Sequence, residues 1–168
     1  MELWVVRHAK AGHRGPEWPD DRERTLTPAG ERQAARLAGL LERMEVRFDR
    51  LFCSPWVRAA QTAEPLRVAL ASGRHVEHLD ALTAGDPLAL VAALNAEVGA
   101  DDACVAVVGH EPQLSLFGSL ILTGRGDGML VSFGKAGALV LEGDVAPGRM
   151  ALRALLPASV VASLRSRA

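Results

Sequence analysis

Two histidines in this sequence each come after a short apolar segment, and one of them has an arginine beside it. Arg7 and His8 directly follow the apolar residues 3–6, and His110 follows the apolar residues 105–108 with one glycine between. Such segments are typical of buried strands in an α/β sheet, where ligands bind beyond the carboxyl ends of the strands. Because an arginine fork matches phosphate oxygens well, this pair of strand ends predicts an anion site suited to phosphate.

A third candidate segment follows the apolar residues 51–53. Ser54 and Pro55 predict the start of a helix there, with Ser54 as its cap or as a phosphate ligand, and Arg58 follows about one turn later. Helix N-termini carry free N–H groups and a partial positive charge, so they favour anions. If the three strands are neighbours, these side chains converge at one sheet edge. The expected phosphate-binding set is Arg7, His8, Ser54, Arg58 and His110.

Helical patterns fill the intervals between these apolar segments. Thr27-Pro28 predicts a helix with core positions through Met44, Asp86-Pro87 predicts one through Val98, and Pro112 begins one that stops near Gly124. Pro65 is expected to kink or divide the helix after Ser54.

Beyond the last of these helices the pattern changes to strands. We expect a short strand at 129–133 and then an antiparallel pair at 137–142 and 149–156, joined by a turn-rich segment. The tail from Pro157 is expected to form a short helix or to fray. The order of elements predicts an α/β fold. It is a three-layer sandwich with a mostly parallel central sheet, helices on both faces and antiparallel strands at one edge.

The composition fits a single domain spanning residues 1–168, because 49% of the residues are hydrophobic and 23% are charged. With 19 basic and 20 acidic residues the chain is nearly neutral, which argues against nucleic acid or a membrane surface as a partner. The two cysteines, Cys53 and Cys104, give neither a disulfide framework nor a metal-binding spacing. We therefore expect a cytoplasmic protein without a metal or other cofactor.

The segments that carry these candidates resemble the three signature blocks of the histidine phosphatase superfamily, also called phosphoglycerate mutase-like. The blocks are LWVVRHA at 3–9, SPWVRAAQT at 54–62 and VAVVGHEP at 105–112. The nearer resemblance is to the small bacterial branch of SixA-type phosphohistidine phosphatases, which the stretches 21–30 and 82–86 also resemble.

This resemblance implies a metal-independent phosphatase with the phosphoglycerate mutase-like fold. His8 matches the nucleophile that accepts the phosphoryl group as a covalent phosphohistidine, and Arg7 and Arg58 match the arginines that hold its oxygens. His110 matches the second histidine, which stabilises the transferring group. The chemistry agrees, because catalysis of phosphoryl transfer depends mostly on positioning and positive charge.

The chain departs from the family pattern at two positions. Ala9 stands where glycine is usual, which matters only if a positive φ angle is needed there. Many members also carry a glutamate that protonates the leaving oxygen, whereas residues 79–82 have alanine at the aligned position. Asp80 and Asp86 are nearby candidates for a general acid, although Asp86 fits helix capping better. An alkyl phosphate needs such an acid more than phosphohistidine does, so we expect a preference for good leaving groups.

The expected substrate is a phosphohistidine protein or a small phosphorylated metabolite. The connections between the blocks are short, which favours an open site that admits a protein side chain. Two alternatives stay open: a catalytically weak phosphate-binding module that recognises a phosphorylated partner, and a phosphomutase, which would need a lid and the missing acid. Further residues could border the pocket, namely Lys10, Arg24, Trp18 and Trp56.

Overall fold

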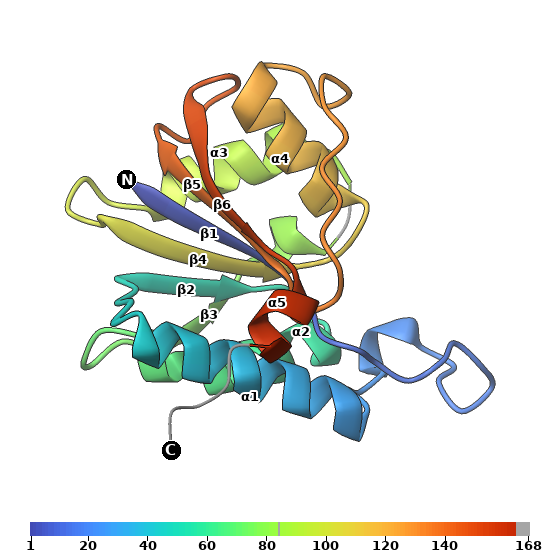
Figure 1. Cartoon of the computed structure of the whole chain (residues 1–168). Coiled ribbons are helices and arrows are strands. Elements are labelled where there is room, and N and C mark those ends of the chain that lie inside the picture. Colours follow the sequence, from blue (N-terminus) through green and yellow to red (C-terminus); the bar gives the residue numbers. More distant parts are fainter. Residues whose placement is uncertain (84, 164–168) are drawn as a thin grey trace.

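The computed structural model describes residues 1–83 and 85–163, and its centre is a six-stranded sheet in the order β3-β2-β4-β1-β5-β6 (Figure 1). β1, β4, β2 and β3 are parallel to one another, and β5 pairs antiparallel with both β1 and β6. The strands are β1 (Glu2–Arg7), β2 (Arg50–Cys53), β3 (Val76–His78), β4 (Cys104–Gly109), β5 (Ala138–Gly143) and β6 (Met150–Leu156).

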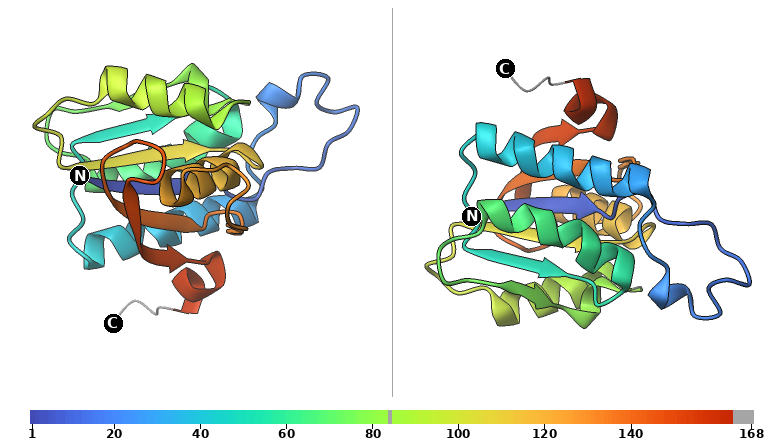
Figure 2. Two further views of the ribbon diagram at one scale, coloured as in Figure 1. Left: turned by 90° about the horizontal axis from the view of Figure 1, so that it is seen from above. Right: turned by 90° about the horizontal axis from the view of Figure 1, so that it is seen from below.

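Helices cover both faces of this sheet, as the views from above and below show (Figure 2). One face packs against α1, α2 and α5, and the other against α3 and α4. Their bounds are α1 (Pro28–Arg43), α2 (Val57–Leu66), α3 (Pro87–Glu97), α4 (Gln113–Thr123) and α5 (Ala158–Ser163). Three 3₁₀ turns accompany them: η1 (Asp21–Glu23), η2 (Arg67–Ala69) and η3 (Asp80–Leu82). The predicted three-layer α/β architecture is therefore confirmed.

The alternation of side chains along the central strands accounts for the two cores. In β1, Leu3 and Val5 join the core under α3 and α4, whereas Trp4 and Val6 join the core under α1 and α2. Because successive side chains of a strand point to opposite faces, a strand covered on both sides has to be apolar throughout. This requirement explains why the strands that carry the candidate residues read as continuous apolar segments.

Local capping signals account for the helix starts that the sequence predicts. The Thr27 hydroxyl accepts a hydrogen bond from the Gly30 N–H at 3.1 Å, and the Asp86 carboxylate accepts one from the Leu88 N–H at 2.9 Å. α4 ends at Gly124, whose φ of 82° is the left-handed conformation that glycine adopts without strain.

Several expectations about the elements are wrong. Residues 129–133 form no strand, because they pair with none of the six strands, although Val131 and Phe133 are buried in the core under α3 and α4 and Leu130 is fully exposed. β3 was not expected, since it is only three residues long and none of them is fully buried. Met44 is 51% exposed rather than in the core, because α1 ends before it.

The helix after β2 also differs from its prediction. α2 begins at Val57 with Trp56 as its N-cap, so Ser54 and Pro55 lie before the helix instead of opening it. Pro65 falls in the last turn of α2, and the chain continues from Leu66 into η2. A proline there removes one helical hydrogen bond, in keeping with the change to 3₁₀ geometry.

The connection between β1 and α1 projects from the body of the molecule beside the carboxyl end of the sheet (Figures 1 and 2). It is joined to itself by a bridge between Ala11 and Leu26 and includes η1. The short connections expected from the sequence do not describe this segment, which contributes side chains to the candidate site.

Candidate phosphate-binding site

The carboxyl ends of three adjacent strands bring the candidate residues together. β4 lies between β2 and β1, with Arg7 in register with Gly109 and Cys53 with Val108. Backbone hydrogen bonds continue past the strand ends, since the N–H of His8 donates to Gly109 O at 3.0 Å and the N–H of Ser54 donates to Val108 O at 2.9 Å. The residues that follow each strand therefore start from fixed positions at one edge.

His8 is 7% exposed and its ring is held in one orientation by the backbone. Its Nδ1 lies 2.7 Å from the carbonyl oxygen of Ala9. Because a carbonyl oxygen can only accept, Nδ1 carries the proton, and in the neutral ring Nε2 keeps its lone pair. Ala9 is itself fixed, since its N–H donates to the Thr62 hydroxyl of α2 at 3.0 Å. Ala9 is not among the described residues with positive φ, so alanine fits here without strain.

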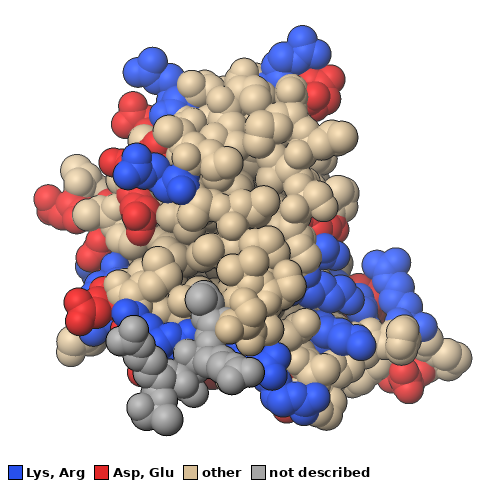
Figure 3. All heavy atoms as spheres, in the orientation of Figure 1, with Lys and Arg blue, Asp and Glu red and all other residues tan. Residues whose placement is uncertain are grey.

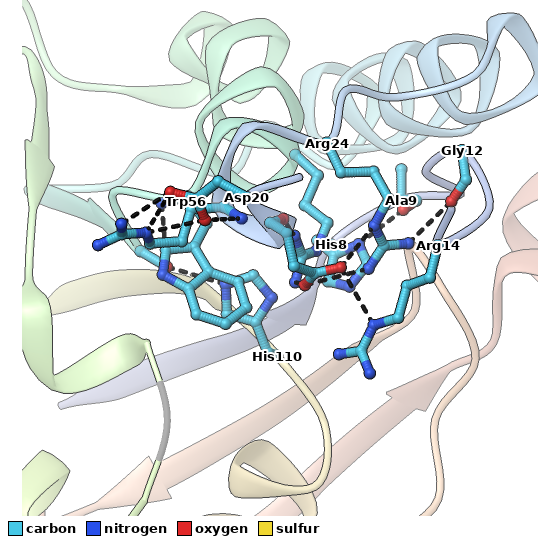
Figure 4. A network of polar contacts seen from close by, with 12 residues as sticks. His8, Ala9, Gly12, Arg14, Asp20, Arg24, Trp56 and His110 are labelled. Atoms are coloured by element: carbon cyan, nitrogen blue, oxygen red, sulfur yellow. Dashed lines mark hydrogen bonds and ion pairs between the residues drawn. The ribbon is translucent and has the colours of Figure 1, made fainter. Parts of the chain in front are cut away.

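His110 lies next to His8, with ring centroids 5.0 Å apart. It also contacts the Trp56 indole at a centroid distance of 4.7 Å, and Figure 4 shows the two rings side by side. The His110 Nε2 is 2.8 Å from the Ser54 hydroxyl, so Ser54 orients the second histidine. The same hydroxyl accepts a weak hydrogen bond, 3.3 Å long, from the N–H of Trp56. Trp56 is the N-cap residue of α2. The structure thus places Ser54 beside an imidazole and not at the helix cap position.

Arg58 lies in the first turn of α2 and is 3% exposed. Its guanidinium stacks over the Trp56 ring at 4.5 Å and donates to both the backbone and the side chain of Asp21. Asp21 also accepts hydrogen bonds from Arg24 at 3.0 Å and from Arg14 at 3.1 Å. One carboxylate from the projecting segment therefore holds three arginines. Sequence analysis singled out Arg24 but missed both Asp21 and Arg14.

The two histidines and the three arginines held by Asp21 line a cavity of about 510 Å³ that opens at the carboxyl edge of the sheet. Lys and Arg side chains gather beside the projecting segment on this side of the molecule (Figure 3). Among the described lining residues Glu111 is the only acidic one. The charged, imidazole and aromatic residues of the lining are Arg7, His8, Arg14, Arg24, Trp56, Arg58, His110, Glu111 and Lys135.

Unsatisfied polar atoms concentrate in this cavity. Within the described part of the chain, every buried side-chain nitrogen or oxygen without a hydrogen-bond partner belongs to a residue of the lining. Such groups are rare in folded proteins and are typical of sites that bind a ligand. The atoms are Arg7 Nε, Arg58 Nε, His110 Nδ1, Glu111 Oε1 and Gln113 Oε1.

Both imidazoles are neutral at pH 7. Burial, opposed by the hydrogen bond to Ala9 and reinforced by the charges of Arg58 and Arg7, lowers the pKa of His8 from 6.5 to about 4. Burial and the nearby His8 and Arg58 lower the pKa of His110 to about 3. A cationic pocket disfavours a further positive charge on either ring, so His8 stays available as a base or nucleophile.

The structure does not bring either suggested general acid into the cavity. Asp80 is exposed at the start of η3, and Asp86 is exposed with its carboxylate engaged in capping α3. Neither residue belongs to the described lining, and neither do Lys10 and Trp18. Two lining residues that sequence analysis missed, Glu111 and Gln113, directly follow His110, and that proximity was the available signal.

Among residues 1–83 and 85–163, no group of three or more His, Cys, Asp or Glu side chains is placed to hold a metal ion. No helix in that part of the chain has the length and apolar character needed to cross a membrane.

An open α/β sheet with paired imidazoles and clustered guanidinium groups at its carboxyl edge defines an anion-binding α/β protein. The family model of the histidine phosphatase superfamily (branch 1) matches residues 3–84. An uncharacterised protein of Picosynechococcus sp. is 33% identical over 147 residues, which cover 87% of each chain. The chain belongs to the histidine phosphatase superfamily, and this membership supports a phosphatase activity.

Solved structures agree with this assignment. The protein histidine phosphatase SixA, solved with tungstate, has a TM-score of 0.81 at 24% identity, covering 95% of this chain and 98% of that chain. A structure reported as that of a phosphohistidine phosphatase SixA from Nakamurella multipartitia has a TM-score of 0.76 at 27% identity, covering 92% of this chain and 94% of that chain. The fold of this chain is therefore similar to that of SixA phosphatases.

Proposed function

We propose that this protein is a metal-independent phosphatase in which His8 accepts the phosphoryl group as a covalent phosphohistidine. The observation that carries this proposal is the hydrogen bond from His8 Nδ1 to the Ala9 carbonyl, which leaves Nε2 unprotonated inside a cationic cavity. A neutral imidazole with a fixed ring and a free lone pair is what nucleophilic attack on phosphorus requires.

The reaction has two steps. In the first, His8 Nε2 forms a bond to phosphorus while the bond to the leaving atom breaks, and the leaving group takes that electron pair and a proton from solvent. In the second, a water oxygen bonds to phosphorus and the P–Nε2 bond breaks. Its electrons return to His8, and the water proton goes to solvent.

Charge stabilisation is the role proposed for the neighbouring residues. Arg7 and Arg58 hold the non-bridging oxygens, on which charge is concentrated in the transition state. The ring centroid of His110 lies 5.0 Å from that of His8. Its neutral imidazole is proposed to stabilise the phosphoryl group during transfer. Ser54 keeps that ring in place through its hydroxyl.

The proposed substrate is phosphohistidine on a protein, or a small phosphate ester with a good leaving group. In support, neither Asp80 nor Asp86, the two acids that the sequence suggests, belongs to the described lining of the cavity. An alkyl phosphate releases a strongly basic alkoxide and so depends on a positioned acid, whereas phosphohistidine releases a weakly basic imidazole. The similarity to SixA agrees with this choice.

Turnover of three substrates tests the proposal: a phosphohistidine peptide, p-nitrophenyl phosphate and an alkyl phosphate. We expect the first two to be hydrolysed and the alkyl ester to react at least about 100-fold more slowly, which is the contribution of general acid catalysis. His8→Ala should abolish turnover, and the control His78→Ala, at an exposed residue outside the described lining, should not change it. Folded wild-type protein without turnover would favour a phosphate-binding module, and equal rates on the aryl and alkyl esters would show that a proton donor acts.

A further inference from the structure

Lys135 is a cation of the cavity for which the sequence gives no explanation. It lies in the connection between α4 and β5, is half-buried and belongs to the cavity lining. Among residues 1–83 and 85–163, no carboxylate is within ion-pair distance of its ammonium group. By contrast, Arg14, Arg24 and Arg58 all pair with Asp21.

The backbone of Lys135 is tied to the strand end that carries His8. The N–H of Ala136 donates to Arg7 O at 3.0 Å and to His8 O at 3.3 Å, and the N–H of Arg7 donates to Gly137 O at 3.1 Å. These bonds on both sides of one turn fix the position of residue 135 relative to His8. Lys135 therefore lies on a backbone segment that is held against β1 and not on a free surface loop.

This turn also contains backbone strain. Ala136 has a φ of 57°, in the left-handed region that residues other than glycine seldom adopt. The turn closes tightly, since the N–H of Gly137 donates to Gly134 O at 2.9 Å and a Cβ at Gly137 would lie 2.8 Å from that oxygen. Strained residues of this kind persist where the surrounding structure holds them, and they cluster at functional sites.

The largest electrostatic influences on Lys135 are repulsive. Burial lowers the pKa of its ammonium group, and the charges of Arg7, Arg24, Lys10 and Arg58 lower it further. Lys135 in turn is one of the charges that lower the pKa of His8. The electrostatic energy of a half-buried cation among other cations is unfavourable. A bound anion makes the electrostatic energy of that cation favourable.

We propose that the Lys135 ammonium group binds a non-bridging oxygen of the phosphoryl group, both in the incoming substrate and on His8. This inference rests on the proposed function, and it adds a substrate-binding cation to the two arginines already assigned to the phosphoryl group. The turn at Gly134–Gly137 places Lys135 near His8 on one side of β1. Arg58 reaches the site from α2, on the other side of β1.

Binding of inorganic phosphate, measured by titration calorimetry, tests the role of Lys135. We expect Lys135→Met to weaken phosphate binding roughly 10- to 100-fold, the effect of one charge-assisted hydrogen bond, and to lower kcat/KM for p-nitrophenyl phosphate by a similar factor. Lys135→Arg should retain most of the affinity. The matched control is Lys10→Met, which removes a neighbouring charge outside the described lining and should change binding less than about threefold, as expected for screened exposed charges.

Turnover and phosphate binding, measured together on the same preparations, separate this inference from the proposed function. If wild-type protein shows no turnover but phosphate binding still depends on Lys135, the phosphatase proposal fails and the role of Lys135 stands. If wild-type protein turns over and Lys135→Met matches Lys10→Met in both measurements, the role of Lys135 is wrong. Lys135→Gln, a smaller neutral replacement, replaces the methionine variant if the latter does not fold.

Discussion

Asp21 and Arg58 are 37 residues apart in the chain and form an ion pair at the border of the candidate site. The Arg58 Nη2 donates to the Asp21 carboxylate at 3.0 Å, and its Nη1 donates to the Asp21 carbonyl oxygen at 2.6 Å. Burial would raise the pKa of Asp21, but hydrogen bonds from Arg24 and Arg14 and the charge of Arg58 hold it below its usual value. Through this carboxylate the projecting segment sets the position of an arginine in α2.

Asp21→Asn is expected to separate positioning from binding. The amide keeps the backbone contact to Arg58 but loses the charge that gathers the guanidinium groups, so kcat should fall about 10-fold through loss of alignment. The affinity for inorganic phosphate should stay equal or rise, because a negative charge has left the site. Steady-state kinetics together with calorimetry measure both quantities.

The matched control is Asp20→Asn. Asp20 pairs with Arg22 at the surface and caps η1 without contacting Arg58, so this variant should keep the wild-type kcat within about twofold. If Asp21→Asn and Asp20→Asn have the same kinetics, Asp21 does not position Arg58.

The buried histidines predict how stability depends on pH. The pKa of His8 is about 4 and that of His110 about 3, both below 6.5, so the unfolded chain takes up protons first as the pH falls. The free energy of unfolding should therefore have its full value above pH 6.5. It should decrease as the pH falls towards 4, by on the order of 3 kcal/mol per histidine. Urea unfolding at pH 7 and pH 4.5 measures this loss.

A double variant provides the control for that measurement. His8→Asn with His110→Asn should reduce the loss between pH 7 and pH 4.5, whereas His13→Asn with His78→Asn, at exposed positions, should leave it unchanged. Equal stability of the wild-type protein at the two pH values would mean that these imidazoles take up protons as readily in the folded protein as in the unfolded chain.

Gly30 marks a close approach between α1 and the segment that follows His8. A Cβ at this position would lie 2.0 Å from the backbone oxygen of Lys10, which also accepts hydrogen bonds from the N–H and hydroxyl of Thr27. Gly30→Ala should therefore destabilise the fold by about 1–3 kcal/mol through overpacking. Thermal or urea unfolding checks this expectation.

Gly39→Ala in the same helix tests whether the effect belongs to that contact. Its Cβ would be 3.5 Å from the flexible Arg43 side chain, so the change should stabilise the helix by up to about 1 kcal/mol. Equal destabilisation by the two alanines would contradict the close approach.

The parts of the site that the sequence predicts are those set by local patterns. Arg7, His8 and His110 follow apolar strands whose burial on both faces is visible in their composition, and the caps Thr27 and Asp86 act within their own turns. Parallel neighbours then place these strand ends together, which requires only the sheet order.

The parts that could not be predicted depend on contacts between distant segments. Asp21 lies among alternating charges that look like a solvated turn, and its partner in the site, Arg58, is supplied only by the approach of α2. Lys135 follows a glycine in an irregular connection, so its tie to β1 leaves no local signal. Ser54 has the sequence pattern of a helix cap, but His110 provides a competing partner for its hydroxyl.

Mapping the phosphorylated residue tests the central claim most directly. The protein would be mixed with a phosphohistidine peptide, quenched within one turnover under alkaline conditions and analysed by mass spectrometry. We predict a phosphoryl group on His8, absent from a folded His8→Ala variant. A label on His110, or undiminished turnover by His8→Ala, would contradict the account.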